Sequence, residues 1–255
     1  TRFTLSSSAR FLSQNIIVKS PLQCPELKSD AVKQPLPFFV MKDFLHPNKV
    51  NETALVDGHT GKTMTYGENY YSSHSLADSL RERYGIKKED VVAIMSPNHI
   101  HFFTVFMGTA LSGAISTALN PLYSPTEIKY QLDATNSKVI FCHPQCLDRV
   151  SKATEDKKIP IVVMDDGLSK PVIDEKVRAQ HEVVMLSELF SVDVKESKFD
   201  YKKYLSTGFS EDGIVTLPFS SGTTGRSKGV MLTHKNIISN ILQTKQIEPR
   251  GTLMI

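Results

Sequence analysis

The sequence contains no tryptophan and only three cysteines, Cys24, Cys142 and Cys146, in 255 residues. A chain of this length can bury a hydrophobic core without disulfides, so the low cysteine content favours a reducing compartment. Basic residues exceed acidic residues by only three, and both signs are mixed along the chain. The sequence therefore lacks the sustained basic surface of a nucleic-acid-binding protein, and we expect no nucleic-acid partner.

A complete set of metal ligands is also missing. Cys142, His143 and Cys146 are close enough in sequence to suggest a metal site. A structural zinc site needs four ligands, however, and no second pair follows at a suitable spacing. We therefore expect buried thiols and assign no metal. His99 and His101 lack further ligands in the same way and are expected either to pack against their neighbours or to lie at the surface.

Charged residues are absent from residues 91–126, and residues 102–119 are apolar enough to raise the question of a membrane span. Two glycines and a serine interrupt this stretch, and an Asn-Pro pair follows it closely. We interpret it as a buried helix followed by a buried strand at 115–118, and we expect no transmembrane segment.

The first 25 residues contain three basic residues and many serines but no acidic residue. This composition is typical of an organellar transit peptide, and a solvated chain terminus is the alternative interpretation. We therefore divide the chain into a leader at residues 1–35, with a possible transit segment, and a folded domain at residues 36–255. Mitochondrial localisation is one expectation, and a cytoplasmic or peroxisomal location is the alternative.

Strand and helix signals alternate from about residue 36. Residues 53–56 and 64–66 flank a turn and predict a hairpin, which is followed by a helix that ends at Gly85. Further strands are predicted at 91–95, 115–118, 139–142, 161–164 and 183–186, and helices at 96–113, 124–135 and 146–155. These strands are apolar throughout, which favours a largely parallel sheet covered by helices on both faces, an α/β fold. Residues 168–210 are more charged and are expected on the surface.

One helix has a clear start signal. Ser124 is placed to be its N-cap, Pro125 its first residue, and Glu127 the residue that bonds back to the cap. This pattern predicts a capping box and a helix that runs to about Thr135.

The strongest chemical signal is a loop rich in serine, threonine and glycine between two predicted strands, at residues 220–229. Its candidate ATP- and phosphate-binding residues are Ser220, Ser221, Gly222, Thr223, Thr224, Gly225, Lys228 and Gly229. The glycines allow the backbone to approach a ligand closely, and the hydroxyls, amides and lysine ammonium suit an anion with many oxygens. The loop is therefore predicted to bind a polyphosphate.

Two other interpretations of the loop fit its residues less well. It is not a Walker A motif, because Ser227 stands where that motif needs glycine and Gly229 stands where serine or threonine should follow the lysine. A flexible linker would have a similar composition, but linkers seldom lie tightly between two strands. His234, after the second strand, is expected to begin a helix rather than act as a base.

The run from Ser220 to Gly229, followed by Val-Met-Leu-Thr-His, resembles the signature of the AMP-binding, adenylate-forming superfamily. Residues 65–68, 90–94, 96–98, 113–114 and 120–127 are similar to the 4-coumarate-CoA ligase and luciferase-like branch, so the resemblance covers roughly residues 53–240. Ser227 departs from the pattern, which usually has proline there, and this change is expected to reduce the rigidity of the loop.

The resemblance implies the N-terminal adenylation domain of an acyl-CoA synthetase, incomplete at its C-terminus, within residues 36–255. It implies ATP-dependent activation of a fatty or aryl carboxylic acid to acyl-AMP and then acyl-CoA, with ATP, Mg²⁺ and CoA, while the loop holds the β- and γ-phosphates. It also implies that the remaining motifs of such enzymes lie beyond Ile255, so this chain carries no catalytic residue and needs the missing C-terminal part. The alternative is a non-catalytic nucleotide-binding or interaction protein derived from such a ligase.

Overall fold

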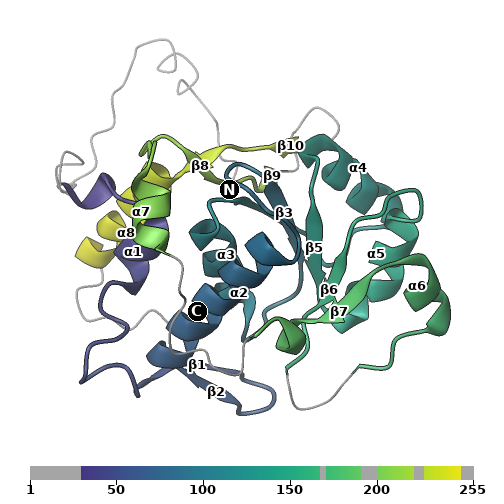
Figure 1. Cartoon of the computed structure of the whole chain (residues 1–255), viewed down its shortest axis with the longest axis horizontal. Coiled ribbons are helices and arrows are strands. Elements are labelled where there is room, and N and C mark those ends of the chain that lie inside the picture. The colour runs from purple at the N-terminus through teal and green to yellow at the C-terminus, as the bar shows by residue number, and fades with distance from the viewer. Residues whose placement is uncertain (1–29, 167–170, 191–199, 221–226, 248–255) are drawn as a thin grey trace, which may run out of the picture.

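A computed structural model describes residues 30–166, 171–190, 200–220 and 227–247. Within these ranges, seven strands form one sheet in the order β11-β8-β4-β3-β5-β6-β7 (Figure 1). The strands are β3 (Val91–Met95), β4 (Ile115–Leu119), β5 (Val139–Cys142), β6 (Ile161–Val163), β7 (Val183–Met185), β8 (Ile214–Thr216) and β11 (Leu232–Thr233). All neighbours are parallel except β11, which runs antiparallel to β8. The predicted largely parallel sheet is confirmed.

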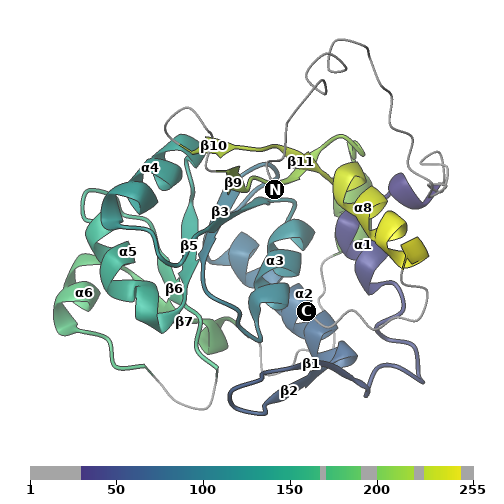
Figure 2. The same cartoon turned by 180° about the vertical axis from the view of Figure 1, so that it is seen from behind.

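The central strands are buried on both faces. Every residue of β3 and of β5 is buried, because helices cover the sheet from two sides. Val92, Ile94 and Phe141 pack under α2 (Tyr66–Glu82) and α3 (Phe102–Leu111). On the other face, Met95 and Ile140 pack under α4 (Pro125–Thr135) and α5 (Leu147–Ala153). Figures 1 and 2 show helices on both sides of the sheet. This two-sided burial explains why the strands carry no alternation of apolar and polar residues.

The smaller elements surround this core. A hairpin of β1 (Thr53–Val56) and β2 (Thr63–Thr65) lies beside α2, and α1 (Leu36–Met41) packs against α8 (His234–Ile247). The remaining elements are η2 (Asp30–Val32), η3 (Pro144–Cys146), α6 (Glu175–Gln180), η4 (Leu186–Leu189), α7 (Tyr201–Ser206), β9 (Phe219–Ser220) and β10 (Lys228–Gly229). Residues 1–29, most of the proposed leader, lie outside the described ranges.

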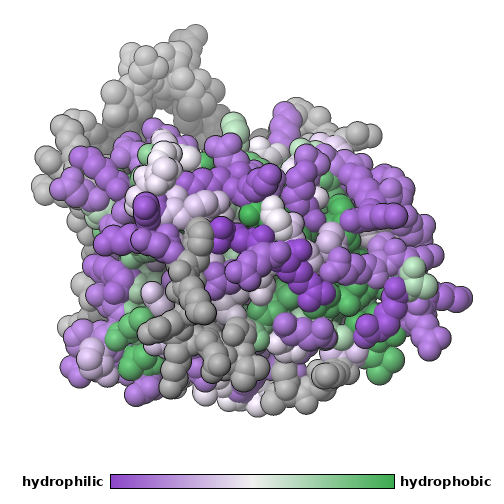
Figure 3. Space-filling model, viewed as in Figure 1, coloured by the Kyte–Doolittle hydropathy of each residue, from purple (hydrophilic) through white to green (hydrophobic). Residues whose placement is uncertain are grey.

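Most of the charge-free stretch at 91–126 is interior up to the end of β4, whereas residues 120–126 lie at the surface. The interior part contains α3, whose side chains pack between α2 and the sheet, and the buried strand β4. In the part of the chain that the structure describes, no helix has both the length and the apolarity needed to cross a bilayer. Figure 3 shows hydrophilic residues over most of one face of the molecule, with smaller hydrophobic patches between them.

The expectation that residues 168–210 lie on the surface is wrong in part. Strand β7 pairs with β6 in the main sheet, and Val184 and Met185 are buried. In α7, Tyr201 is only 3% exposed and donates a hydrogen bond of 2.5 Å to the Asp78 carboxylate on α2. The buried residues of this segment are divided among short elements, so they produce no periodic signal in the sequence.

Candidate nucleotide-binding site

The two ends of the predicted phosphate loop meet in a short antiparallel ladder. Strand β9 pairs with β10, so that Ser220 lies opposite Lys228 and Phe219 lies opposite Gly229. Residues directly opposite each other in such a pair point to the same face, so the Ser220 hydroxyl and the Lys228 ammonium share one side of the ladder. Both residues are exposed to solvent. The ladder therefore presents a hydroxyl and a fixed positive charge together, which suits an anionic ligand.

Three of the eight candidate residues, Ser220, Lys228 and Gly229, are thus placed by the structure at the base of the loop. The other five lie outside the described residues: Ser221, Gly222, Thr223, Thr224 and Gly225. Their predicted contribution to phosphate binding stays a prediction.

The chain leading into the loop is fixed by the sheet and by α4. The Thr117 hydroxyl on β4 donates to the Leu217 carbonyl at 2.7 Å, and the Leu217 amide donates to the Ser116 carbonyl at 2.8 Å. The side-chain amide of Gln131, on α4, donates in turn to the Thr117 hydroxyl at 2.8 Å. Thr117 and Gln131 are both almost completely buried. This relay couples the position of α4 to the strand that enters the loop.

The exit of the loop is held from α4 as well. The Tyr130 hydroxyl donates to the Ser227 carbonyl at 3.2 Å, and the Tyr130 ring meets the Phe219 ring edge-on at 6.5 Å. The Phe219 ring lies over Gly229, where an added Cβ would come within 3.1 Å of the ring. Sequence reasoning did not identify Tyr130 or Gln131. The one available signal was a glutamine at a helix position flanked by apolar residues, which often marks a buried hydrogen-bonding role.

His234 acts as a structural residue at the start of α8. Its Nδ1 accepts a hydrogen bond from the Leu36 amide at 3.1 Å, which ties α8 to the start of α1. Burial lowers the pKa of His234 to about 4, so the ring is neutral near pH 7. The expectation that His234 begins a helix is confirmed.

Cys142, Cys146 and His101 are buried, and His99 and His143 are partly buried. Cys142 and Cys146 are buried free thiols, and burial raises the pKa of both, so neither is a thiolate near neutral pH. The His99 ring lies 5.7 Å from His101 and 5.8 Å from His143, measured between centroids. Across the described ranges, no three His, Cys, Asp or Glu side chains are arranged to hold a metal ion.

The His99 and His143 rings are also unsuited to bind a metal through their free nitrogens. The Nδ1 atom of His99 accepts the His101 amide, and that of His143 accepts the Gln145 amide, each at 3.2 Å. A neutral ring that accepts at Nδ1 carries its proton on Nε2, and a protonated nitrogen is not a metal ligand. These hydrogen bonds therefore give the rings a local structural role.

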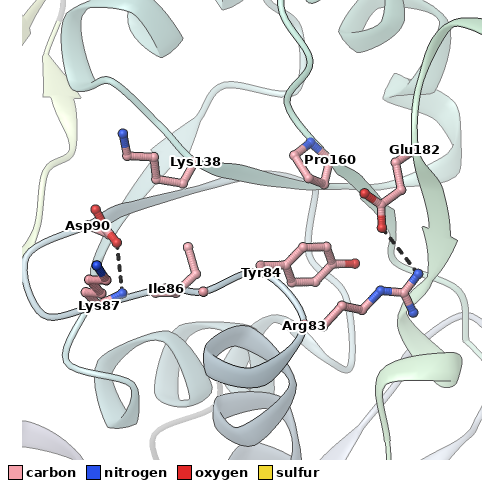
Figure 4. A pocket seen from close by; sticks show the side chains of 9 residues that line it. Arg83, Tyr84, Ile86, Lys87, Asp90, Lys138, Pro160 and Glu182 are labelled. Carbon is pink, nitrogen blue, oxygen red and sulfur yellow. Dashed lines mark hydrogen bonds and ion pairs between the residues drawn. The ribbon is translucent and has the colours of Figure 1, made fainter.

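A cavity of about 500 Å³ lies at the amino-terminal ends of β3, β5, β6 and β7 (Figure 4). It is bounded by the end of α2 and by the residues that directly precede β3, β5, β6 and β7. Arg83 forms an ion pair with Glu182 at 3.3 Å, and the Asp90 carboxylate accepts the backbone amide of Lys87 at 2.8 Å. In Figure 4 the Lys138 ammonium points away from the Tyr84 ring at the centre. Ser220 and Lys228 do not line this cavity.

The match to a known family covers the loop and the sheet together. A family model described as AMP-binding enzyme matches residues 46–254. The chain belongs to the AMP-binding enzyme family. The resemblance seen in the loop residues is thereby confirmed.

Curated relatives within this family include plant ligases. The chain is similar to 4-coumarate–CoA ligase 1 from Arabidopsis thaliana, with 33% identity over 189 residues, which cover 74% of this chain and 32% of the relative. It is similar to 4-coumarate-CoA ligase 1 from Narcissus pseudonarcissus, with 38% identity over 193 residues, 74% of this chain and 31% of the relative. The chain thus spans about a third of the length of the curated relatives it matches.

Solved structures of the same type share the fold. A luciferase-like enzyme from the mealworm Zophobas morio superposes with a TM-score of 0.64 and 21% identity, covering 84% of this chain and 46% of that chain. A benzoate CoA ligase from Burkholderia xenovorans gives a TM-score of 0.64 and 19% identity, covering 87% of this chain and 38% of that chain. The predicted fold, that of the N-terminal part of an adenylate-forming ligase, is confirmed.

Proposed function

We propose that the loop at residues 220–229 binds the polyphosphate of ATP. We also propose that the protein, as a member of the AMP-binding enzyme family, activates a carboxylic acid. The observation that carries the proposal is the pairing of Ser220 with Lys228 on one exposed side of the β9–β10 ladder. A hydroxyl and an ammonium in this arrangement can contact neighbouring oxygens of one polyphosphate.

The reaction would first join the acid to AMP with release of pyrophosphate, and would then transfer the acyl group to the thiol of CoA with release of AMP. In the first step negative charge grows on the leaving pyrophosphate. The Lys228 ammonium and the Ser220 hydroxyl would bind these oxygens and stabilise that charge, a positioning and electrostatic role. A proton-transfer residue is not required in this part of the chain.

Mg²⁺ is included in the proposal as a companion of ATP. It would neutralise charge on the phosphate oxygens, and it commonly takes most of its ligands from phosphate and water rather than from a protein cage.

For the substrate, we infer an aryl or fatty carboxylic acid. The inference is supported by the names of the similar proteins, which are ligases for 4-coumarate and for benzoate and a mycobacterial fatty acyl CoA synthetase. Panels of aryl and aliphatic acids in ATP–pyrophosphate exchange would separate these two classes.

Calorimetric titration with Mg-ATP tests the loop directly. We expect Lys228→Ala to weaken binding by about 10- to 100-fold, since a hydrogen bond to a charged group contributes roughly 1.5–3 kcal/mol. Lys176→Ala removes an equally exposed lysine from α6 and should bind as the unaltered chain does. Equal affinities for all three proteins would contradict the proposal.

The same loop could instead belong to a non-catalytic nucleotide-binding protein. ATP–pyrophosphate exchange distinguishes a ligase from such a protein. Exchange with at least one acid, reduced by Lys228→Ala, supports the ligase. Tight binding without exchange, in a chain extended to the length of its relatives, would support the non-catalytic alternative.

Mitochondrial targeting by the first 35 residues is also a proposal. It is supported only by their basic, serine-rich and acid-free composition up to residue 25. Fusion of residues 1–35 to a fluorescent protein, with Arg2 and Arg10 replaced by glutamate as the control, would test it. Diffuse fluorescence from the unaltered fusion would contradict it.

A further inference from the structure

The base of the phosphate loop is very short and carries little stability of its own. Each of its strands, β9 and β10, contains two residues, and both Ser220 and Lys228 are exposed. An isolated two-stranded ladder is marginally stable at best in water. Contacts from outside the ladder must therefore set the position and the order of Lys228.

Helix α4 provides such a contact immediately before Lys228. The Tyr130 hydroxyl donates to the carbonyl of Ser227, the residue preceding Lys228, at 3.2 Å. The Tyr130 ring also meets Phe219, on the opposing strand, edge-on with an interplanar angle of 90°. One side chain thus contacts both strands of the ladder.

Helix α4 is itself well fixed, which makes it a suitable anchor. A capping box formed by Ser124 and Glu127 closes its first turn. The next residue after Tyr130, Gln131, is 1% exposed and bonds to Thr117 and to the Ala118 carbonyl of β4, at 2.8 and 3.0 Å. The tyrosine hydroxyl is therefore held by a helix whose position the sheet determines.

We propose that Tyr130 is a positioning residue for the phosphate loop: its hydroxyl holds the Ser227 carbonyl and thereby presents the Lys228 ammonium to the bound polyphosphate. The link to ligand binding rests on the proposed function of the loop. The link to the order of the loop does not, and each can be measured separately.

Tyr130→Phe is the informative substitution, because it removes the hydroxyl and keeps the ring against Phe219. Tyr123→Phe is the matched control. Tyr123 lies just before α4 and packs its ring against the neighbouring core, and its hydroxyl has no hydrogen bond among the contacts found in the described residues. Both variants should melt within a degree or two of the unaltered chain, since neither creates a cavity.

The first measurement is made without nucleotide. Hydrogen exchange at the amides of residues 228–230 and the rate of tryptic cleavage after Lys228 report how often the ladder opens. Tyr130→Phe should increase both by about three- to tenfold, the effect of losing one ordinary hydrogen bond, while Tyr123→Phe leaves them unchanged. Unchanged exchange and cleavage in Tyr130→Phe would overturn the proposal.

The second measurement is Mg-ATP affinity in a double-mutant cycle. Tyr130→Phe should weaken binding by about three- to tenfold in the unaltered chain and by less than twofold when Lys228 is already alanine. Equal losses in the two backgrounds would show that Tyr130 does not act through Lys228 and would overturn the positioning role.

The two measurements also separate this proposal from that for the loop as a whole. If the unaltered chain fails to bind Mg-ATP, the proposed function fails, and the exchange rates still decide whether Tyr130 orders the ladder. If the chain binds Mg-ATP and Tyr130→Phe changes neither exchange nor affinity, the function stands and the role of Tyr130 is refuted.

Discussion

Ser220 and Lys228 lie opposite each other in the β9–β10 ladder, so the two ends of the serine- and glycine-rich loop are fixed at one place on the protein. The loop is thereby closed before any ligand binds. A closed loop loses less conformational entropy when it orders around a phosphate than an open chain would. If the loop binds a phosphate as proposed, the ladder and its supports on β4 and α4 contribute to binding by limiting this loss.

Thr117 should be essential to that support. Thr117→Val removes the hydroxyl that bonds to Leu217 and Gln131, leaving buried polar groups unpaired, and should lower the free energy of unfolding by about 1–3 kcal/mol. Thr104 is equally buried, but its hydroxyl has no partner among the described groups, so Thr104→Val should be neutral or stabilising. Urea unfolding of both variants gives the comparison, and similar losses would contradict the assigned relay.

The capping box of α4 should contribute measurably to stability. Ser124→Ala removes a hydroxyl that contacts the Glu127 amide and carboxylate, and should cost about 1 kcal/mol, as N-cap substitutions commonly do. Thr126→Ala, on the same exposed turn, is the control and should have little effect. Thermal unfolding at pH 7 measures the difference.

Glu127 adds a pH dependence to this cap. Its pKa lies below the usual range because the Ser124 hydroxyl and amide bond to the carboxylate. The stability that Glu127 contributes is therefore present above the pKa of an unfolded glutamate, about 4.3, and is lost as the pH falls through the lower folded value. Glu127→Gln should be less stable than the unaltered chain at pH 7, and the difference should shrink as the pH falls below about 4.3 and the carboxylate becomes protonated. A difference that persists at low pH would be evidence against the assignment.

His234 should make the protein sensitive to mild acid. The folded pKa of about 4 lies below the unfolded value of about 6.5, because the native ring is buried and accepts the Leu36 amide at Nδ1. The unfolded state therefore binds a proton first, and stability falls as the pH drops from about 6.5 to about 4, by at most about 3 kcal/mol from this residue.

His234→Asn tests this assignment, since asparagine can offer an acceptor oxygen near the Nδ1 position and does not titrate. Burial also lowers the pKa of His101 to about 4. His101 is present in both the unaltered chain and His234→Asn, so its contribution to the pH dependence cancels in the comparison. Chemical unfolding between pH 4 and pH 7 should show a smaller slope for the variant. Identical slopes would show that His234 is not the group responsible.

Gly108 should be required for the close crossing of α2 and α3. A Cβ at this position would lie 3.0 Å from Leu76 side-chain atoms and from the Ser73 carbonyl, so Gly108→Ala should cost about 1–3 kcal/mol through overpacking. Gly58→Ala is the matched control, because no atom lies within 4 Å of the added Cβ. Differential scanning calorimetry would measure both, and a Gly108→Ala protein as stable as the control would contradict the helix crossing.

The sequence by itself determined the class of fold and the family to which the chain belongs. Apolar strands without alternation predicted the parallel sheet, and Ser124 with Glu127 predicted the start of α4, because these signals come from residues close together in the chain. The hydroxyls, glycines and lysine of residues 220–229 indicated a polyphosphate for the same reason.

Only the tertiary structure decided how the loop is held. The bond from Tyr130 to Ser227, the relay from Gln131 to Leu217, and the burial of Tyr201 against Asp78 join residues far apart in sequence. No local pattern specifies such partners, because a helix or strand propensity depends on neighbours along the chain, whereas these contacts depend on which faces the sheet order brings together.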